Sequence, residues 1–163
     1  MPLPCYLTIK GAKQGKIEGS CEVAGHIGEI EIQAVEHTVE IPRNPQTGQP
    51  TGQRVHGVIK LTKVLDKASP KILQALVTGE PLEEVKLAFY RFNQKSGTTE
   101  KYYTITLKDA TVATGHLSVS NCLLESNKAL GHMEDISFAY GTIIWSADMD
   151  SVESQDSWKE TAA

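Results

Sequence analysis

Residues 27–41 read IGEIEIQAVEHTVEI, and apolar residues alternate with polar ones along most of this stretch. Alternation of this kind is typical of a β-strand with one buried face. The apolar side changes between Ala34 and Val35. Such a one-residue phase change predicts a β-bulge, and a bulge bends a sheet towards a barrel. The apolar positions are Ile27, Ile30, Ile32 and Ala34 before the change and Val35, His37, Val39 and Ile41 after it.

Strand-like alternation recurs along the rest of the chain, so we expect a mainly β protein. Gly97 in a short polar segment marks a hairpin turn between two of these strands. We expect residues 109–121 to form a strand, a glycine break and a second strand, and residues 135–147 to form one last strand with a bulge at Gly141. The other strand-like segments are CYLTIK (5–10), VHGVIKLTKVLDK (55–67), VKLAFYRFN (85–93) and EKYYTITL (100–107).

One segment has helical rather than strand periodicity. Ser69 followed by Pro70 is typical of a helix N-cap and first turn, and Gly79 with Pro81 is typical of a helix end. We therefore expect one helix of about ten residues. Its apolar positions are Ile72, Leu73, Leu76 and Val77.

Length and charge indicate one globular domain with a tail. The 163 residues are 40% apolar and 22% charged, which is ordinary for a soluble domain. Residues 1–147 hold 15 acidic and 15 basic side chains, whereas residues 148–163 hold five acidic and one basic. The last segment is also rich in serine and poor in apolar residues, so we expect a domain over residues 1–147 and a flexible acidic tail over residues 148–163.

These totals exclude several classes of partner. A neutral body lacks the basic face on which nucleic-acid affinity rests, and no apolar run is long enough to insert into a membrane. The three cysteines include no CxxC pair, which argues against a disulfide framework and a zinc site. With no basic and apolar leader at the N-terminus, we expect the protein to stay in the cytoplasm unless it is exported by a route that reads the folded chain.

No motif predicts catalysis. The five histidines stand alone, without the spacing that places two metal ligands on one helix face. The triplet His132, Met133, Glu134 matches half of a zinc deaminase signature, but the PCxxC half is missing. No GxSxG elbow and no phosphate-binding glycine motif occurs. We therefore expect no catalytic residue, no cofactor-binding residue and no metal ligand.

A polar connection of unusual length lies between two of the expected strands. Residues 41–57 read IPRNPQTGQPTGQRVHG, whereas a hairpin needs only about two to five loop residues. A bulged sheet also has strand edges that must be closed, covered or paired. These two features predict that the protein oligomerises through its sheet edges and the long loop.

The residues of the central segment resemble a known family. The run VIKLTKVLDKASPKILQALVTGEPLEEVKLAFYR (58–91) is similar to the Hcp family, the hemolysin-coregulated tube proteins of type VI secretion systems. The similarity extends to the long loop, to EKYYTITLKDATV (100–112) and to LGHMEDISFAYGTIIW (130–145). It covers residues 3–147, and its most specific element is the run from Leu65 to Pro70.

The resemblance implies a fold and an assembly. It implies a small bulged β-barrel, made of two packed antiparallel sheets, with one short flanking α-helix and an extended loop. It implies a homo-hexamer whose rings stack as the inner tube, with the sheath and the tip protein as further partners and small effector proteins in the lumen. It also implies that the protein is cytoplasmic before assembly and is then secreted by the type VI route without a signal peptide.

The resemblance further assigns roles to residues of the loop and of the strand before it. The loop from Pro42 to Gln53 corresponds to the family's extended loop, and its stacking contacts are expected from Arg43, Asn44, Gln46, Thr47 and Gln49. The strand from Ile30 to Ile41 corresponds to a region that faces the lumen with one side. On that strand, Glu36, Thr38 and Glu40 are expected to face the lumen and to contact cargo, with an outward solvated face as the alternative.

A second function class stays open at this point. The chain could be a stand-alone enzyme or a small-ligand-binding barrel in which the histidines line a pocket. The missing catalytic motifs and the long loop favour the tube subunit.

Overall fold

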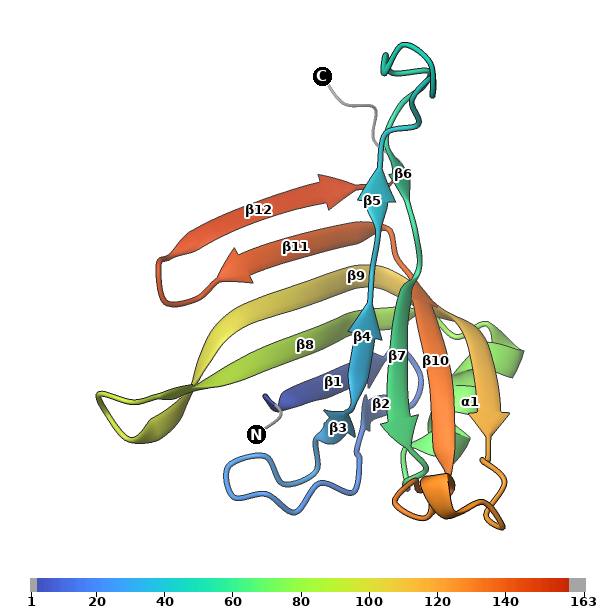
Figure 1. Ribbon diagram of the computed structural model, residues 1–163, viewed down its shortest axis with the longest axis vertical. Helices are drawn as coiled ribbons and strands as arrows, with labels where there is room; N and C mark the ends of the chain where they lie inside the picture. Colours follow the sequence, from blue (N-terminus) through green and yellow to red (C-terminus); the bar gives the residue numbers. More distant parts are fainter. Residues whose placement is uncertain (1–2, 159–163) are drawn as a thin grey trace.

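The computed structural model describes residues 3–158, and the fold is mainly β, as predicted (Figure 1). The single α-helix and the long loop expected from the sequence are both present. The elements are β1 (Cys5–Gly11), β2 (Gly15–Ile17), β3 (Ile30–Ile32), β4 (Ala34–Glu36), β5 (Val39–Glu40), β6 (Val55–His56), β7 (Ile59–Val64), α1 (Ser69–Thr78), β8 (Leu82–Asn93), β9 (Thr98–Ser118), the 3-10 helix η1 (Glu125–Asn127), β10 (Met133–Ala139), β11 (Thr142–Ala147) and β12 (Val152–Ser157).

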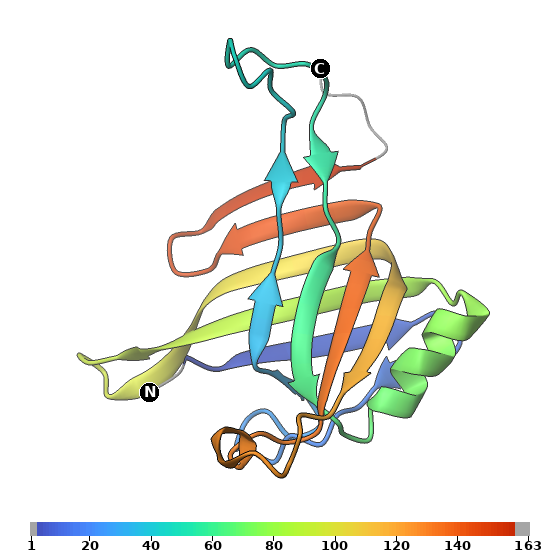
Figure 2. The ribbon, with the colours of Figure 1, turned by 45° about the vertical axis from the view of Figure 1, so that its right-hand side comes forward.

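The strands form two packed antiparallel layers (Figures 1 and 2). The first layer contains β1, β8, β11, β12 and the first half of β9, and the second contains β4, β7, β10 and the second half of β9. β3 pairs with β1 and β4 pairs with β7, although only Gln33 separates β3 from β4. The segment from β3 to β4 and the long strand β9 therefore both pass from one layer to the other and join the layers.

The phase change between Ala34 and Val35 lies where the chain crosses between the layers. Ile30 and Ile32 are buried, Gln33 and Ala34 are both exposed, and Val35 is half-buried opposite the buried Leu61. The backbone N–H of Gln33 donates to the carbonyl of Thr62 at 2.8 Å, so the crossing is fastened to β7. Two consecutive exposed residues shift the alternation by one position, so the buried side chains change from one side of the strand to the other.

The expected single strand over residues 135–147 is wrong, because the chain turns a corner there. β10 belongs to the second layer and β11 to the first, and they are separated by Tyr140 and Gly141. The N–H of Gly141 donates to the carbonyls of Lys108 and Asp109, where β9 makes its own bend with Asp109 at φ 51°. The β10–β11 corner and the bend in β9 are therefore joined by hydrogen bonds.

The expected glycine break at residue 115 is also wrong. β9 runs without interruption from Thr98 to Ser118, and Gly115 lies inside it. A Cβ atom at this position would lie 2.7 Å from Cδ2 of Leu73 on α1. The glycine therefore lets the helix approach the sheet and does not end a strand.

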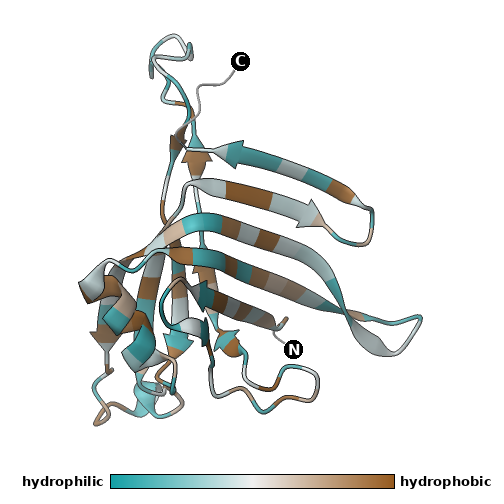
Figure 3. Ribbon diagram, turned by 180° about the vertical axis from the view of Figure 1, so that it is seen from behind, coloured by the Kyte–Doolittle hydropathy of each residue, from teal (hydrophilic) through white to brown (hydrophobic). Residues whose placement is uncertain are grey.

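The core lies between the two layers and under the helix. Figure 3 shows alternating apolar and polar bands along the strands, which is the pattern of strands with one buried face. Ile72 and Ala75 of α1 are buried against this core, and Gly79 ends the helix at φ 67°. The largest fully buried apolar side chains are Phe138, Leu7, Ile9, Ile17, Ile30, Ile59, Leu61, Ile72, Leu82, Leu87 and Leu107.

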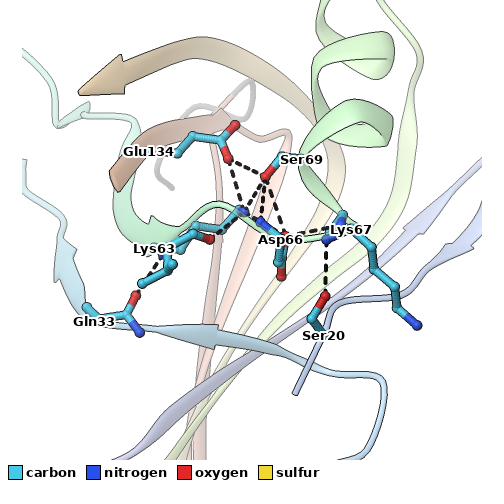
Figure 4. Close-up of polar contacts among 9 residues, drawn as sticks. Ser20, Gln33, Lys63, Asp66, Lys67, Ser69 and Glu134 are labelled. Carbon is cyan, nitrogen blue, oxygen red and sulfur yellow. Dashed lines mark hydrogen bonds and ion pairs between the residues drawn. The ribbon is translucent and has the colours of Figure 1, made fainter. Parts of the chain in front are cut away.

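A buried charged cluster fixes the start of the helix (Figure 4). Lys63 is fully buried, and its ammonium group lies 2.9 Å from a carboxylate oxygen of Asp66 and 3.0 Å from one of Glu134. Ser69 accepts a hydrogen bond from Lys63 at 2.8 Å and donates one to Glu134 at 2.6 Å. Ser69 is thus not the N-cap that we expected, because its hydroxyl is committed to this cluster, while Asp66 accepts from the N–H of Ala68.

The expected flexible tail is wrong for residues 152–157, which form β12. This strand pairs with β11 over its whole length, from Val152 opposite Ala147 to Ser157 opposite Thr142. Backbone pairing and the contacts of Asp156 supply the order that its acidic, serine-rich composition does not predict. Residues 159–163 of the expected tail lie outside the described residues.

Candidate functional site

The long loop, residues 42–53, is a narrow continuation of the β5–β6 pair. It stands clear of both layers at one end of the molecule's longest axis (Figure 1). Val39 pairs with His56 and Glu40 with Val55 at its base, and Arg43 is bridged to Pro50 further out. The loop's length thus extends a two-stranded ribbon, which explains why the connection far exceeds a tight turn.

The tip of the loop is held by its own polar groups. The side-chain oxygen of Asn44 accepts from the N–H groups of Gln46 and Thr47 at 2.8 and 3.2 Å, which forms a local turn. The guanidinium of Arg43 donates to the carbonyl of Gly48 at 3.0 Å, and Gly48 adopts φ 73°. Three of the five residues expected to make stacking contacts, namely Arg43, Asn44 and Thr47, therefore also shape the loop.

Gln46 and Gln49 are the other two residues of that expectation, and they present their side chains to solvent. Both are exposed, and within the described part of the chain neither side-chain amide has a hydrogen-bond partner. An amide group offers both donors and an acceptor. These two glutamines are the polar groups at the tip best suited to bind another surface.

A polar chain of five side chains fastens the loop roots, residues 37–40 and 54–56, to the body. The hydroxyl of Tyr140 lies 2.6 Å from Nδ1 of His56 and 2.9 Å from Nε2 of His37. Nε2 of His56 lies 2.7 Å from a carboxylate oxygen of Asp156, which also pairs with Arg54 through both oxygens at 2.5 and 2.8 Å. These five side chains therefore connect both loop roots with the β10–β11 corner and with β12.

The carboxylate sets the direction of this polar chain. Because an ionised Asp156 can only accept, Nε2 of His56 carries a proton and donates to it. In the tautomer with Nδ1 unprotonated, Nδ1 of His56 accepts from the Tyr140 hydroxyl, whose oxygen accepts from Nε2–H of His37. Every donor in the chain has an acceptor when both histidines are neutral.

Electrostatics at the roots favour this arrangement of charges. The hydrogen bond from Arg54 lowers the pKa of Asp156 to about 2, aided by the bond from His56. Burial raises the pKa of Tyr140, and the nearby Asp156 charge raises it further, so the phenol stays protonated. Burial lowers the pKa of His37, and the neighbouring His56 lowers it further.

The expected lumen-facing residues Glu36, Thr38 and Glu40 are all exposed. Glu36 lies opposite Lys60 on the outer face of the second layer, where a hollow of about 370 Å³ forms. Glu36 and Thr38 also border a second hollow of about 290 Å³ beside His37. Glu40 lies further along, in β5 at the base of the loop. The hollow on the outer face is lined by Ala34, Glu36, Lys60, Thr62, Thr114, Asp135, Ile136 and Ser137.

The sequence alone does not predict the polar chain, because each of the five histidines stands isolated in it. His37 and His56 lie on either side of the long loop, and an antiparallel pairing of the loop arms was the signal that could have brought them together. No signal pointed to Asp156, because its segment was expected to be flexible. Across residues 3–158, no group of three or more His, Cys, Asp or Glu residues could hold a metal ion.

The half-signature around His132 also has a structural explanation. Glu134, its third residue, is buried in the ion pair with Lys63 at the helix start. It is therefore committed to a structural contact.

Among residues 3–158, no helix is long and apolar enough to cross a membrane.

Comparison with known proteins identifies the family. A family model described as "Type VI secretion system effector, Hcp" matches residues 6–146. The "Major exported protein" of Pseudomonas aeruginosa is 40% identical over 172 residues, which cover 100% of this chain and 99% of the relative. These matches define a protein of the type VI secretion system. Within that system, the chain belongs to the Hcp family.

Solved structures agree with the family and the fold. A crystal structure of an Hcp protein has 31% sequence identity and a TM-score of 0.89, covering 98% of this chain and 100% of the other. The secreted protein Hcp3 from Pseudomonas aeruginosa has 32% identity and a TM-score of 0.78, covering 98% and 100%. The family resemblance is confirmed. The chain is accordingly a type VI secretion tube protein, a structural protein and not an enzyme.

Proposed function

We propose that this chain forms six-membered rings that stack into the inner tube, with the long loop of one ring contacting the next. The observation that supports the proposal is the loop's form, a ribbon that stands clear of the body at one end of the longest axis (Figure 2). Its internal hydrogen bonds keep it extended without a partner. A projecting, preorganised segment loses little entropy when it docks.

The composition of the loop suits a reversible contact. Gln46 and Gln49 offer hydrogen bonds, and residues 42–53 bury almost no apolar surface. A contact of this kind is weak for one subunit, but six copies in a ring act together and multiply the affinity. A free ring would then stay soluble because its loops are polar, while two stacked rings would stay together through six such contacts.

The exposed side of residues 36–40 is our candidate for the surface that lines the lumen. Glu36, Thr38 and Glu40 would face inwards, with Lys60 opposite Glu36 adding a positive charge. Mixed charges and hydroxyls bind a folded cargo protein through water and polar contacts without fixing it permanently. Small effector proteins would be carried and protected there, and the sheath and tip protein would be further partners.

The same proposal covers the tail and the route of export. Residues 1–147 would be the tube domain, with β12 as an added edge strand. The chain would be cytoplasmic before assembly and leave through the type VI route. The names of its relatives, "Major exported protein" and "Secreted protein Hcp3", support export of this kind.

The decisive experiment replaces Gln46–Gln49 with a glycine-serine link of equal length. Rings should survive with their mass unchanged, while end-to-end stacks seen by negative-stain microscopy become rarer and shorter. A matched control changes Glu36, Thr38 and Glu40 together to Gln, Ser and Gln, which should leave stacking intact and weaken cargo retention. Loss of the ring itself in the loop variant would contradict the proposed place of the loop.

A further inference from the structure

The polar chain at the loop roots has a limited capacity for protons. Tyr140 and His56 are 5% and 3% exposed, and their partners come from four separate segments. The Tyr140 hydroxyl has one proton to donate and faces a ring nitrogen on each side. The hydroxyl donates to whichever of these two nitrogens, Nδ1 of His56 or Nε2 of His37, carries no proton.

One added proton can be accommodated. If His56 becomes charged, its Nδ1–H donates to Tyr140, and the hydroxyl turns to donate to Nε2 of His37 in the other tautomer. The direction of the chain then reverses and every donor keeps an acceptor. Asp156 lies beside the new charge.

A second proton cannot be accommodated in the same way. With both histidines charged, two N–H donors face the one hydroxyl oxygen, and the hydroxyl proton has no acceptor between them. The added positive charges also lie on either side of Tyr140, where the only carboxylate in the polar chain, Asp156, is already shared with Arg54. Like charges held this close in a partly buried site destabilise the contact.

We propose that the polar chain is a pH-sensitive latch: protonation of both His37 and His56 opens it and frees the loop roots and β12. The latch joins His37 and His56 on the two roots to Tyr140 at the β10–β11 corner and to Asp156 in β12, so opening it releases both roots and the Asp156 contact of β12 together. The other charged groups near it are Arg54 on Asp156 and the pair Glu36 and Lys60 beside His37. Glu36 and Lys60 have opposite charges, so they offer no net compensation.

The sign of the pH effect follows from His37. Its pKa in the folded protein lies below the ordinary 6.5, so the folded state favours neutral His37. Stability from this group is present above pH 6.5 and is lost as the pH falls through the lower folded-state pKa. The latch therefore opens on the acid side of pH 6.5.

Hydrogen exchange tests the latch on the full-length chain in any oligomeric state, so its outcome does not depend on ring formation. After correction for intrinsic rates, amides of the loop roots (residues 37–40 and 54–56) and of residues 152–157 should lose protection as the pH falls below the transition. The loss is about a hundredfold for each pH unit where opening takes up both protons, and about tenfold where His56 already holds one. Amides of β1 and β8 should keep their protection. Equal protection of the roots at pH 7.5 and pH 5 would overturn the latch.

Three variants separate the latch from a general effect of acid. His37→Gln keeps an amide donor for Tyr140 but cannot take a proton, so the acid loss of protection should disappear. Tyr140→Phe removes the shared hydroxyl, so the roots should exchange rapidly already at pH 7.5. His116→Gln changes an exposed histidine that is not part of the polar chain, so this variant should behave as wild type. An unchanged acid response in His37→Gln, or its loss in His116→Gln, would overturn the proposal.

Trp158 provides a second readout at the same place. Its ring lies 5.8 Å from that of His56 and 5.5 Å from that of Tyr140. In a Trp145→Phe background, Trp158 is the remaining tryptophan, and its emission should change over the same pH interval as the exchange of the roots. Emission that does not vary between pH 7.5 and pH 5 would show that Trp158 and His56 stay together and that the latch does not open.

Discussion

The ammonium group of Lys63 lies 3.0 Å from the carboxylate of Glu134, and both side chains are withdrawn from solvent at the start of α1. Asp66 supplies a second carboxylate and Ser69 a hydroxyl, so no polar atom of the cluster lacks a partner. The cluster joins β7, β10 and the helix. It gives a physical reason for the run from Leu65 to Pro70 that carries the family resemblance.

Lys63→Met should destabilise the protein by about 3–5 kcal/mol, because it leaves buried carboxylates without a counter-charge. The measurement is equilibrium urea unfolding. Lys60→Met on the same strand changes an exposed lysine and should stay within about 0.5 kcal/mol of wild type. Equal losses in the two variants would show that the buried cluster contributes nothing specific.

Asp156 should make stability fall in acid. Its pKa is about 2 when folded against an ordinary 3.8, so its contribution is full above pH 3.8 and is lost as the pH falls towards 2. Because the carboxylate is partly exposed, we expect roughly 1–2 kcal/mol after solvent screening. Urea unfolding from pH 7 to pH 2 should show that Asp156→Asn removes this part of the acid slope. Asp150→Asn, in the exposed β11–β12 turn, should leave the slope as in wild type, and indistinguishable slopes for the two variants would count against the Arg54 pair.

Gly19→Ala should cost about 1–3 kcal/mol through overpacking. A Cβ atom there would lie 2.4 Å from the carbonyl oxygen of Glu29 and 2.7 Å from Ile30, so the backbone must shift. Gly52→Ala in the long loop is the control, because its Cβ would meet no atom within 4 Å. Thermal or urea unfolding of the two variants measures the difference. A neutral Gly19→Ala would mean that the turn between β2 and β3 is not packed as described.

Asn44→Ala should loosen the tip of the loop without destabilising the fold. It removes the acceptor of two backbone N–H groups, so amides of residues 43–50 should exchange roughly 2- to 10-fold faster. The free energy of unfolding should change by less than about 0.5 kcal/mol, because the loop is exposed. Gln46→Ala, which removes a side chain without such bonds, is the control for exchange. If Asn44→Ala exchanges like wild type, the loop is not preorganised.

The sequence predicted the fold class well where one local pattern decides the structure. The phase change at Ala34 and Val35 marked the crossing between layers, and the periodicity of residues 69–79 marked the helix. Gly115 was misread because glycine in a strand has two explanations, a break or a close approach, and only the position of Leu73 distinguishes them.

The long loop could be predicted from the sequence, and the polar chain at its roots could not. Composition and length drew attention to the loop, and the family resemblance is the basis for proposing that it contacts another ring. The polar chain could not be predicted, because the order of Asp156 depends on pairing with β11 and on Arg54, which lies 102 residues away in the chain. Contacts at that separation leave no trace in local composition.

The measurement that tests the central claim most directly is the mass of the native protein in solution. Size-exclusion chromatography with light scattering should give about six times the chain mass of 17.8 kDa, and negative-stain microscopy should show six-membered rings. A mass of one chain at every concentration, with no rings in the micrographs, would contradict the account of this protein as a ring-forming tube subunit.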